Sequence, residues 1–357
     1  FKDTLNLEFD EDGKAKQRKG MVKTGDTIAA GADIAGSFLF SFEDAGNPPT
    51  QNHILLTVAS NATIYHLNGS YLTAAVAVAD TTINAIDISG NFTASGNIEI
   101  NGDDIGYTGV GASSFTGATG IGKAHLNRSL VNQWESAGSS NVDTRVGVYF
   151  AFLNNLCFIN GYQGSATFNG VTSSAVSDDD EPAGLFATNY RERIYLAGSG
   201  IADAAGTRNG SQKRVSFSDA GDATSWDLNN FFDVEDDRGE MITGLKEHSD
   251  RLIIFKMNST FFYDEIQLQQ TSYNIGAYNH YVVQKIDNLL YTFCPRGIFV
   301  TDGVNFKPIW YPVKKYLEGF HPTYDLQLGR VITNCFSGQY QGKYYLKRSN
   351  NKFTAVI

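Results

Sequence analysis

The chain has 357 residues, of which 42% are hydrophobic and 18% are charged, and its formal net charge is -10. This length and apolar content suffice for one large β domain or two smaller domains, and they exclude a disordered chain. The negative charge repels nucleic acid on average, which excludes tight DNA binding across a basic face but not brief contact. Glycine (36 residues), tyrosine (18) and phenylalanine (24) outnumber proline (7), which favours many strands joined by glycine turns.

Neither a membrane span nor a targeting leader is predicted. The longest uncharged apolar runs, such as AAVAVA at 74–79, fall far short of the roughly 20 residues that a membrane-spanning helix needs. The chain starts at Phe1 rather than Met, and no basic and then apolar leader follows. We therefore expect the natural gene product to begin before this residue.

Short segments that combine aromatic and branched residues recur along the chain, and most are followed by Gly, Asn or Asp. They begin at Phe38, His53, Ala62, Leu156, Arg193, Arg251, Thr260, Leu289, Gly297 and Lys343. Each has the length and composition of a β-strand, and the residues that follow are typical of turns. The sequence therefore predicts an all-β protein.

Several of these strands come in pairs with one layout: a polar residue, an apolar strand, a short turn and an aromatic strand. The clearest pairs are DRLIIFKMNSTFFYD (250–264) and DNLLYTFCPRGIFVTDG (287–303), and looser ones span 52–69 and 154–170. We interpret them as the inner hairpins of successive similar units. A hairpin with one apolar face needs neighbours to exclude water, and most units begin about 40 to 50 residues apart once one insertion is removed, as in propeller blades. The fold prediction is an irregular β-propeller of about five or six blades.

The insertion lies at 83–131, where NIEINGDDIGYTGVGASSFTGATGIG (97–122) is a run of short strands and glycine turns. We predict a small β module that hangs from a blade loop, because a longer loop adds little entropic cost. The predicted organisation is thus the first part of a propeller at 1–82, the inserted module at 83–131 and the remaining blades at 132–357.

The residue types that commonly bind metals are widely scattered. Cys157, Cys294 and Cys335 form no Cys-x-x-Cys pair, which argues against a disulfide framework or a zinc site and favours free, buried thiols. The six histidines lack a metal-binding spacing such as His-x-x-x-His; they are His53, His66, His125, His248, His280 and His321. We therefore predict no metal-binding residues.

The segment from Phe217 to Glu240 is the richest in carboxylates. Asp219, Gly221, Thr224 and Trp226 resemble the Asp-box of sialidase-like propellers, but the spacing to Trp226 is two residues too long and Phe217 replaces the serine. Glycoside hydrolysis also needs paired carboxylates across a cleft, and the sequence identifies no such pair.

The same segment could also bind calcium. The acidic residues that raise this alternative are Asp233, Glu235, Asp236, Asp237 and Glu240, since alternating oxygen ligands suit a hard cation. Arg238 stands where the turn glycine of an EF-hand belongs, and Gly244 where its closing glutamate belongs. We expect a solvated turn between blades here, with an irregular calcium site as the alternative, and a second acidic loop at 178–181.

Motifs of cofactor and acyl chemistry are also missing. The sequence has no phosphate-binding Gly-x-x-x-x-Gly-Lys-[Ser/Thr], no Gly-x-Ser-x-Gly and no dinucleotide fingerprint. The glycine-rich run at 109–122 lacks the lysine and the strand-to-helix context of a phosphate loop. We predict a non-enzymatic protein with no catalytic residues and no cofactor.

Four stretches, taken in order, resemble the β-propeller tail tube or nozzle proteins of short-tailed bacteriophages. LNLEFDEDGKAKQRKGM (5–21) is similar to the N-terminal motif of that family. RIYLAG (193–198) with the segment 214–264 resembles its most recognisable part, in which the acidic stretch links two blades. The segment 275–309 resembles the next blade, and 97–122 resembles small β modules of phage structural proteins. Together these stretches cover about half of the chain.

The resemblance implies a virion structural protein in the phage tail, assembled as a homo-oligomeric ring around the channel used for genome ejection. It implies other tail proteins as partners (adaptor and fibres) and transient, non-specific passage of double-stranded DNA. A further blade or platform is expected after Ile357. The alternatives are a carbohydrate-binding or carbohydrate-cleaving propeller at the host surface, or an interaction propeller whose loops bind a protein partner.

Overall fold

The computed structural model describes residues 7–9, 15–17, 34–43, 51–59, 63–86, 88–89, 92–139, 148–153, 155–159, 165–169, 173–176, 178, 180–182, 184–198, 211–311, 323–325, 330–332, 335–340, 342–348 and 354–356. These residues form a β-propeller, and their one helical segment is a short 3-10 helix, η1 (His280–Val282). None of the described helical residues makes a segment long and apolar enough to cross a membrane.

Four sheets have four antiparallel strands each, hydrogen-bonded in the order in which they occur in the chain. The first two are β12 (Val148–Phe152), β13 (Asn155–Ile159), β14 (Ala166–Phe168) and β15 (Ser173–Ala175), then β16 (Phe186–Tyr190), β17 (Arg193–Ala197), β18 (Arg214–Ser218) and β19 (Trp226–Asp233). The next two are β20 (Ile242–His248), β21 (Arg251–Lys256), β22 (Thr260–Tyr263) and β23 (Leu268–Ser272), then β24 (Gln284–Ile286), β25 (Leu289–Cys294), β26 (Gly297–Thr301) and β27 (Phe306–Pro308).

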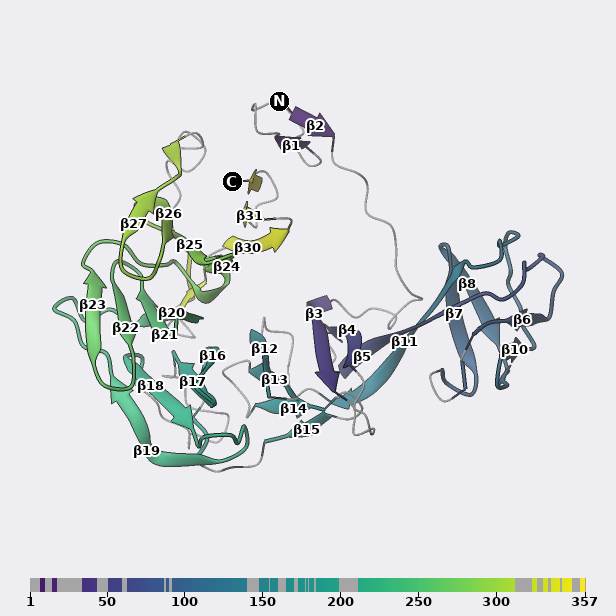
Figure 1. Ribbon diagram of the computed structural model, residues 1–357, viewed down its shortest axis with the longest axis horizontal. Helices are drawn as coiled ribbons and strands as arrows, with labels where there is room; N and C mark the ends of the chain where they lie inside the picture. Colours follow the sequence, from purple (N-terminus) through teal and green to yellow (C-terminus); the bar gives the residue numbers. More distant parts are fainter. Residues whose placement is uncertain are drawn as a thin grey trace.

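Further blade-like sheets flank these four. On one side are β3 (Ile34–Glu43), β4 (Gln51–Ala59), β5 (Thr63–Tyr71) and β11 (Leu130–Ser139), and on the other β30 (Cys335–Tyr340), β31 (Lys343–Arg348) and β32 (Thr354–Val356). Two small hairpins complete this part: β1 (Leu7–Phe9) with β2 (Ala15–Gln17), and β28 (Thr323–Asp325) with β29 (Arg330–Ile332). Figure 1 shows the sheets succeeding one another around a common centre. The described residues thus contain six blade-like sheets, in agreement with the predicted propeller.

The predicted hairpins are not the inner ones. The pairs at 250–264 and 287–303 form β21–β22 and β25–β26, which are the second and third strands of their blades. The first strands are innermost, since β12 contacts β16 and β16 contacts β20. The middle strands are the most apolar because they are paired on both edges and covered by neighbouring blades on both faces. β21, for example, is buried from Leu252 to Lys256.

The inserted module has a core of its own. Its strands are β6 (Thr82–Asn84), β7 (Gly96–Ile100), β8 (Asp103–Tyr107), β9 (Gly109–Val110) and β10 (Ser114–Thr116). The buried cluster runs from Leu72 to Val131 and is centred on Phe115, whose ring lies 5.1 Å from that of Phe92 and 4.9 Å from that of Tyr107. The β7–β8 hairpin turns at Asn101 and Gly102, both with positive φ, as two-residue hairpin turns favour.

The module does not hang from a loop. Strands β5 and β11 pair with each other from Thr63 to Tyr71, and β11 then pairs with β7 through Val131 and Ile100. One six-stranded sheet, β3-β4-β5-β11-β7-β8, therefore runs from the blade into the module. Figure 1 shows the module set apart from the other blades along this ribbon. A continuous ladder of hydrogen bonds fixes the module more firmly than a loop would.

Candidate functional site

Polar turns of neighbouring blades meet at the inner rim of the propeller. Arg191 and Glu192 form the β16–β17 turn, and Ser249 and Asp250 form the β20–β21 turn. All four have φ between 42° and 58°. A left-handed conformation at a residue other than glycine costs about 1–3 kcal/mol and persists where surrounding contacts hold it. The contacts around these turns therefore hold them in this conformation.

Arg191 ties the two turns together. Its Nε and Nη2 donate to the two carboxylate oxygens of Asp250 at 2.9 and 2.6 Å, and its Nη1 donates to Glu265 at 3.0 Å. Nη1 also reaches the carbonyl oxygen of Asp264. These hydrogen bonds raise the pKa of Arg191, and the pKa of Asp250 is lowered in turn by its hydrogen bonds to Arg191. A two-pronged guanidinium contact of this kind fixes geometry as well as charge.

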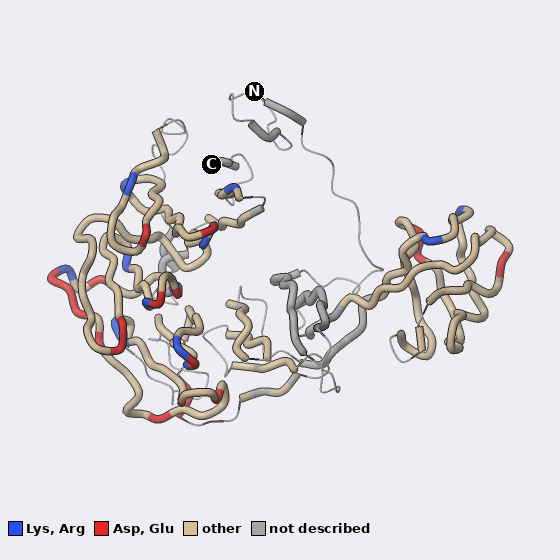
Figure 2. Tube along the Cα trace, in the orientation of Figure 1, with Lys and Arg blue, Asp and Glu red and all other residues tan. Residues whose placement is uncertain are grey.

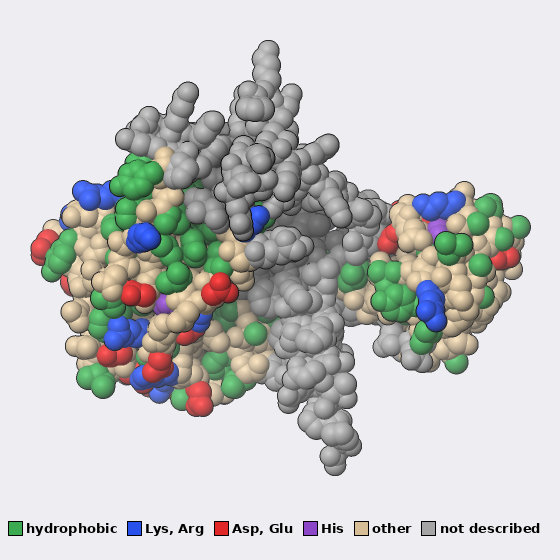
Figure 3. Space-filling model, turned by 45° about the horizontal axis from the view of Figure 1, so that its top comes forward, with side chains coloured by type: hydrophobic (Ala, Val, Ile, Leu, Met, Phe, Trp, Pro, Cys, Tyr) green, Lys and Arg blue, Asp and Glu red, His purple; other side chains and the backbone are tan. Residues whose placement is uncertain are grey.

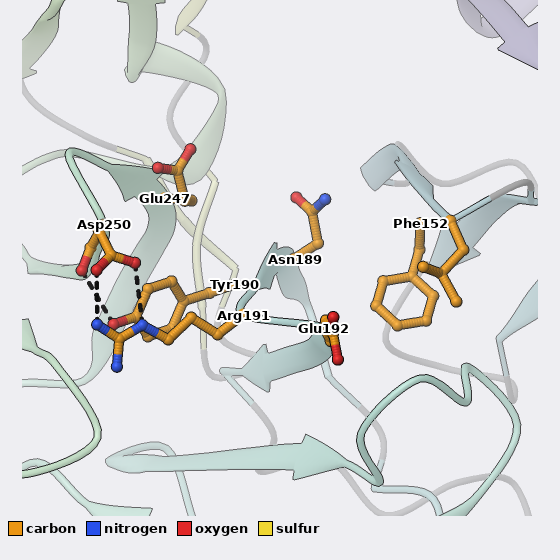
Figure 4. Close-up of a pocket in the computed structure, with 8 residues that line it drawn as sticks. Phe152, Asn189, Tyr190, Arg191, Glu192, Glu247 and Asp250 are labelled. Carbon is orange, nitrogen blue, oxygen red and sulfur yellow. Dashed lines mark hydrogen bonds and ion pairs between the residues drawn. The ribbon is translucent and has the colours of Figure 1, made fainter.

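A pocket of about 370 Å³ opens beside this brace. Its lining comes from three hairpins: Phe152, Leu153, Asn189, Tyr190, Arg191, Glu192, Glu247 and Asp250. Figure 4 shows Asp250 and Phe152 at opposite ends of the group, with Arg191 directed at Asp250.

Most polar groups of the pocket act as ties between blades. Asn189 donates to the Ala151 carbonyl at 3.1 Å, the Tyr190 hydroxyl donates to the Asp250 carbonyl at 3.0 Å, and Glu247 accepts from Lys285 of β24 at 2.8 Å. Burial raises the pKa of Tyr190 to about 12, so its phenol stays a donor at neutral pH. The arginine and the phenol of this pocket, Arg191 and Tyr190, are thus both bound to Asp250 within the chain.

The short helix η1 is a second point where blades converge. The ring of His280 stacks on Phe186 of β16 at 5.8 Å, and His280 Nδ1 accepts a hydrogen bond from the Leu245 backbone of β20. Tyr281 packs against the core cluster of the β12–β15 and β16–β19 sheets. The next residue, Val282, accepts from the Tyr344 hydroxyl of β31 at 2.8 Å. Burial, and then the charge of Lys246, lower the pKa of His280 well below its usual value, so η1 contributes a neutral, tightly packed hub.

The part of the acidic segment that resembles an Asp-box is the β18–β19 turn. Asp219 accepts from Ser225 Oγ at 2.8 Å and from Asn230 Nδ2 at 3.1 Å, and Gly221 has φ +77°. Trp226 is 5% exposed, and its backbone nitrogen donates to Asp178 at 2.8 Å. Asp178 thus supports this hairpin, and Trp226 is packed as expected.

The carboxylates expected to form a solvated turn are mostly paired with basic side chains. Arg214 binds both oxygens of Asp233 at 2.8 and 3.0 Å, and Lys213 binds Glu235 at 2.9 Å. Asp236 is 4% exposed and lies 3.1 Å from Nζ of Lys256, which is fully buried. The expectation of a solvated turn was therefore wrong for Asp236, because Lys256 from β21 needs a buried counter-charge.

These ion pairs also bear on the calcium alternative. Asp233, Glu235 and Asp236 each face a lysine or arginine nitrogen, which occupies the position of a cation. Glu240 instead accepts from the backbone nitrogen and side chain of Asn258 at 3.0 and 2.6 Å. Within the described ranges, no group of three or more His, Cys, Asp or Glu side chains is arranged to hold a metal ion.

The histidines and cysteines have separate surroundings. His125 lies 3.1 Å from Asp103 in the module, whereas His248 is fully buried and neither of its ring nitrogens has a hydrogen-bond partner. His321 lies outside the described residues, as does Asp179 of the 178–181 loop. Cys157, Cys294 and Cys335 are buried, as predicted, and none of these three described residues forms a disulfide.

Charges of both signs are mixed over the propeller. Figure 2 shows Asp and Glu alternating with Lys and Arg along the blades, and the face in Figure 3 has no single basic patch over the described blade residues. Nucleic acid binding relies on clustered basic side chains that displace counterions from phosphates.

Sequence reasoning missed the Arg191 brace. Arg191 and Asp250 both stand in two-residue turns between strands. Polar residues in turns are usually solvated, so only the docking of adjacent blades brings these two side chains, 59 positions apart, into contact. The sequence signal that could have indicated this ion pair is a long basic side chain in the inner turn of one blade and a carboxylate in the inner turn of the next blade.

Comparisons with known proteins assign no family to the chain. No protein-family model and no curated protein matches the chain. Among solved structures, it is similar to PorZ, a surface component of the type-IX secretion system of Porphyromonas gingivalis (9% identity, TM-score 0.40), covering 93% of this chain and 37% of that one. It is also similar to BamB from Moraxella catarrhalis (9%, TM-score 0.38, covering 92% and 98%) and to the GH74 xyloglucanase from Xanthomonas campestris (10%, TM-score 0.33, covering 83% and 47%). The chain spans less than half the length of PorZ and of that xyloglucanase.

Proposed function

We propose that this chain is a structural component of a bacteriophage tail that assembles with copies of itself into a ring around the channel for genome ejection. The main support for this proposal is the way in which the polar side chains of the inner rim are paired. Arg191, Asp250 and Glu265 are bound to one another across adjacent blades rather than presented to a ligand. Such an arrangement supports a stiff wall element, and it adds to the resemblance of the segments 193–198, 214–264 and 275–309 to phage tail nozzle proteins.

The packed residues of η1 support a DNA channel that lies between subunits rather than through the centre of one propeller. Side chains of His280 and Tyr281 contact the sheets that contain β16, β20 and β12, so packed side chains lie where the inner strands converge. A DNA duplex would therefore pass a wall made of whole propellers. Rings close only through head-to-tail contacts between different surfaces of the same subunit.

Charge supports the same role. With a net charge of -10, the subunit supplies little of the counterion release that makes proteins hold DNA. Two basic side chains are already paired with carboxylates of the same chain: Lys256 with Asp236, and Arg214 with Asp233. A channel with such walls lets the genome slide, and the adaptor and fibre proteins of the tail are the partners at its two ends.

The test is the assembly state of the purified chain. Negative-stain electron microscopy and sedimentation velocity should show closed rings with a central hole wide enough for a DNA duplex, and a filter-binding assay at moderate salt should show no retention of that duplex. A monomer that releases reducing ends from host-surface polysaccharide would overturn the proposal in favour of a carbohydrate-cleaving propeller. A monomer without that activity would also contradict it.

A further inference from the structure

A row of exposed apolar side chains crosses three strand segments at the base of the inserted module. Tyr71 is the direct partner of Leu130 in the β5–β11 ladder, and on its other side its carbonyl oxygen accepts from the Ile86 backbone nitrogen at 3.0 Å. Directly opposed residues in antiparallel strands point to the same face with Cβ atoms about 5 Å apart. Leu130, Tyr71 and Ile86 therefore form one row, called here the apolar row.

The apolar row faces away from the module core. Its members are 39%, 53% and 49% exposed in the order Leu130, Tyr71, Ile86, whereas the neighbouring pair Leu72 and Ala85 on the other face is fully buried. The strand alternation thus puts large apolar side chains on both faces of one segment. Antiparallel sheets with one solvated face normally carry polar residues there, so a row of this kind is typical of a surface covered by a partner.

An exposed cation lies close to the row in the chain. Arg128 lies two positions before Leu130, is exposed, and has no carboxylate partner among the described residues. Its φ of 67° fixes it in a tight turn in which Ser129 donates to the Leu126 carbonyl. The partner surface should therefore combine apolar groups with a carboxylate.

The opposite side of the same subunit carries such a surface. Strand β19 is the outermost strand of its sheet, and it exposes Leu228 (68%) and Phe231 (37%). Between them and the turn stands Asp227, which is exposed and accepts only from Asn229 among the described groups. The ring of Phe231 lies 3.5 Å beneath the guanidinium of Arg214, which is itself held by Asp233. In Figure 1 the module and β19 lie on opposite sides of the molecule.

We infer that the apolar row, with Arg128, docks head to tail on the β19 edge of a second copy of this chain. A ring is built from two different patches of the same subunit, and the row offers Tyr71, an aromatic residue of the kind enriched among interface hot spots. The pairing places Arg128 of one copy opposite Asp227 of the next. This inference rests on the proposed function and names the surfaces that would close its ring.

The experiment removes each surface separately in the full chain. Tyr71→Asp and Leu130→Asp alter the row, Leu228→Asp alters the β19 edge, and Ile266→Asp, at an exposed position (92%) that belongs to neither the row nor β19, is the matched control. Circular dichroism and Tm establish that each variant is folded. We expect association to weaken by about 30-fold or more for the row and edge variants, the effect of losing one interface anchor, while Ile266→Asp forms rings as before.

Mixing the variants tests the head-to-tail pairing itself. A Leu228→Asp subunit keeps an intact row and a Tyr71→Asp subunit keeps an intact β19 edge, so together they should form heterodimers that stop at two subunits. Rings that persist in folded Tyr71→Asp would overturn the role of the row but not the proposed function. Absence of heterodimers in the mixture would overturn β19 as the acceptor. A wild-type chain that stays monomeric would overturn both the docking and the ring.

Discussion

Arg191 and Asp250, separated by 59 positions, form a two-pronged ion pair that joins the inner turns of two adjacent blades. Each residue holds a left-handed backbone conformation, with φ of 42° and 55°. The pair therefore fixes two strained turns against each other. The surrounding contacts of Tyr190 and Glu265 belong to the same brace.

Replacing Asp250 by Asn should lower Tm slightly, and the loss should shrink in high salt. Both partners are well exposed, at 38% and 70% of their side-chain surface, so salt at about 1 M, with a Debye length of ~3 Å, screens their attraction. Because the pKa of Asp250 is lowered, its contribution is present above the unfolded pKa of about 3.9 and is lost as pH falls through the folded value. Thermal melts of wild type and variant at two salt concentrations measure this. An Asn variant with an unchanged Tm at low salt would contradict the brace.

Breaking the buried pair of Lys256 and Asp236 should be far more costly. Asp236→Ala leaves a fully buried ammonium without its counter-ion, and such losses amount to about 3–5 kcal/mol of the free energy of unfolding. The double variant Lys256→Met with Asp236→Leu should recover most of that stability, because well-packed apolar residues replace buried ion pairs without a desolvation cost. Urea unfolding of the single and double variants measures both. Equal stability of the Asp236→Ala protein and the wild type would show that the pair contributes nothing.

The fully buried His248 should make the protein sensitive to mild acid. Burial, and then the charge of Lys285, lower its pKa in the folded state, and both ring nitrogens lack partners. The unfolded chain therefore binds more protons below its pKa of about 6.5, and stability falls as pH drops through that window. His248→Leu should be more stable than wild type by about 1 kcal/mol, the lower end of the cost of unsatisfied buried groups, and should have a shallower pH slope. His280, whose pKa is also lowered, still contributes to the pH dependence of the variant. A pH slope identical to that of the wild type would show that His248 contributes none of it.

Gly276 should not tolerate even alanine. A Cβ there would overlap the Lys256 carbonyl oxygen and lie 2.9 Å from the carbonyl carbon of Met257, both backbone atoms that cannot rotate away. Forced overpacking costs about 1–3 kcal/mol and more where the backbone must move. Gly338→Ala is the matched control, since no atom lies within 4 Å of the added carbon. Chemical denaturation should place Gly276→Ala well below Gly338→Ala, and equal midpoints would contradict the close approach.

The strand-rich fold class and the repeated hairpin unit follow from the residue pattern alone. The apolar hairpins at 250–264 and 287–303 were found because middle strands are covered on both faces, so each nearly continuous run identifies itself locally. The same pattern misplaced them as inner hairpins, since innermost strands such as β20 carry polar residues. Glycine turns change the composition over 97–122, where the structure has the short strands β7 to β10.

The contacts of the candidate site depend on the tertiary structure. Arg191 meets Asp250, and Lys256 meets Asp236, through the docking of neighbouring blades and strands rather than through any local spacing. The apolar row arises likewise from the register of β5 with β11, which sets Leu130 beside Tyr71. Charge pairs and cross-strand rows depend on how elements far apart in the chain are brought together, and the local preferences of the residues carry no record of that arrangement.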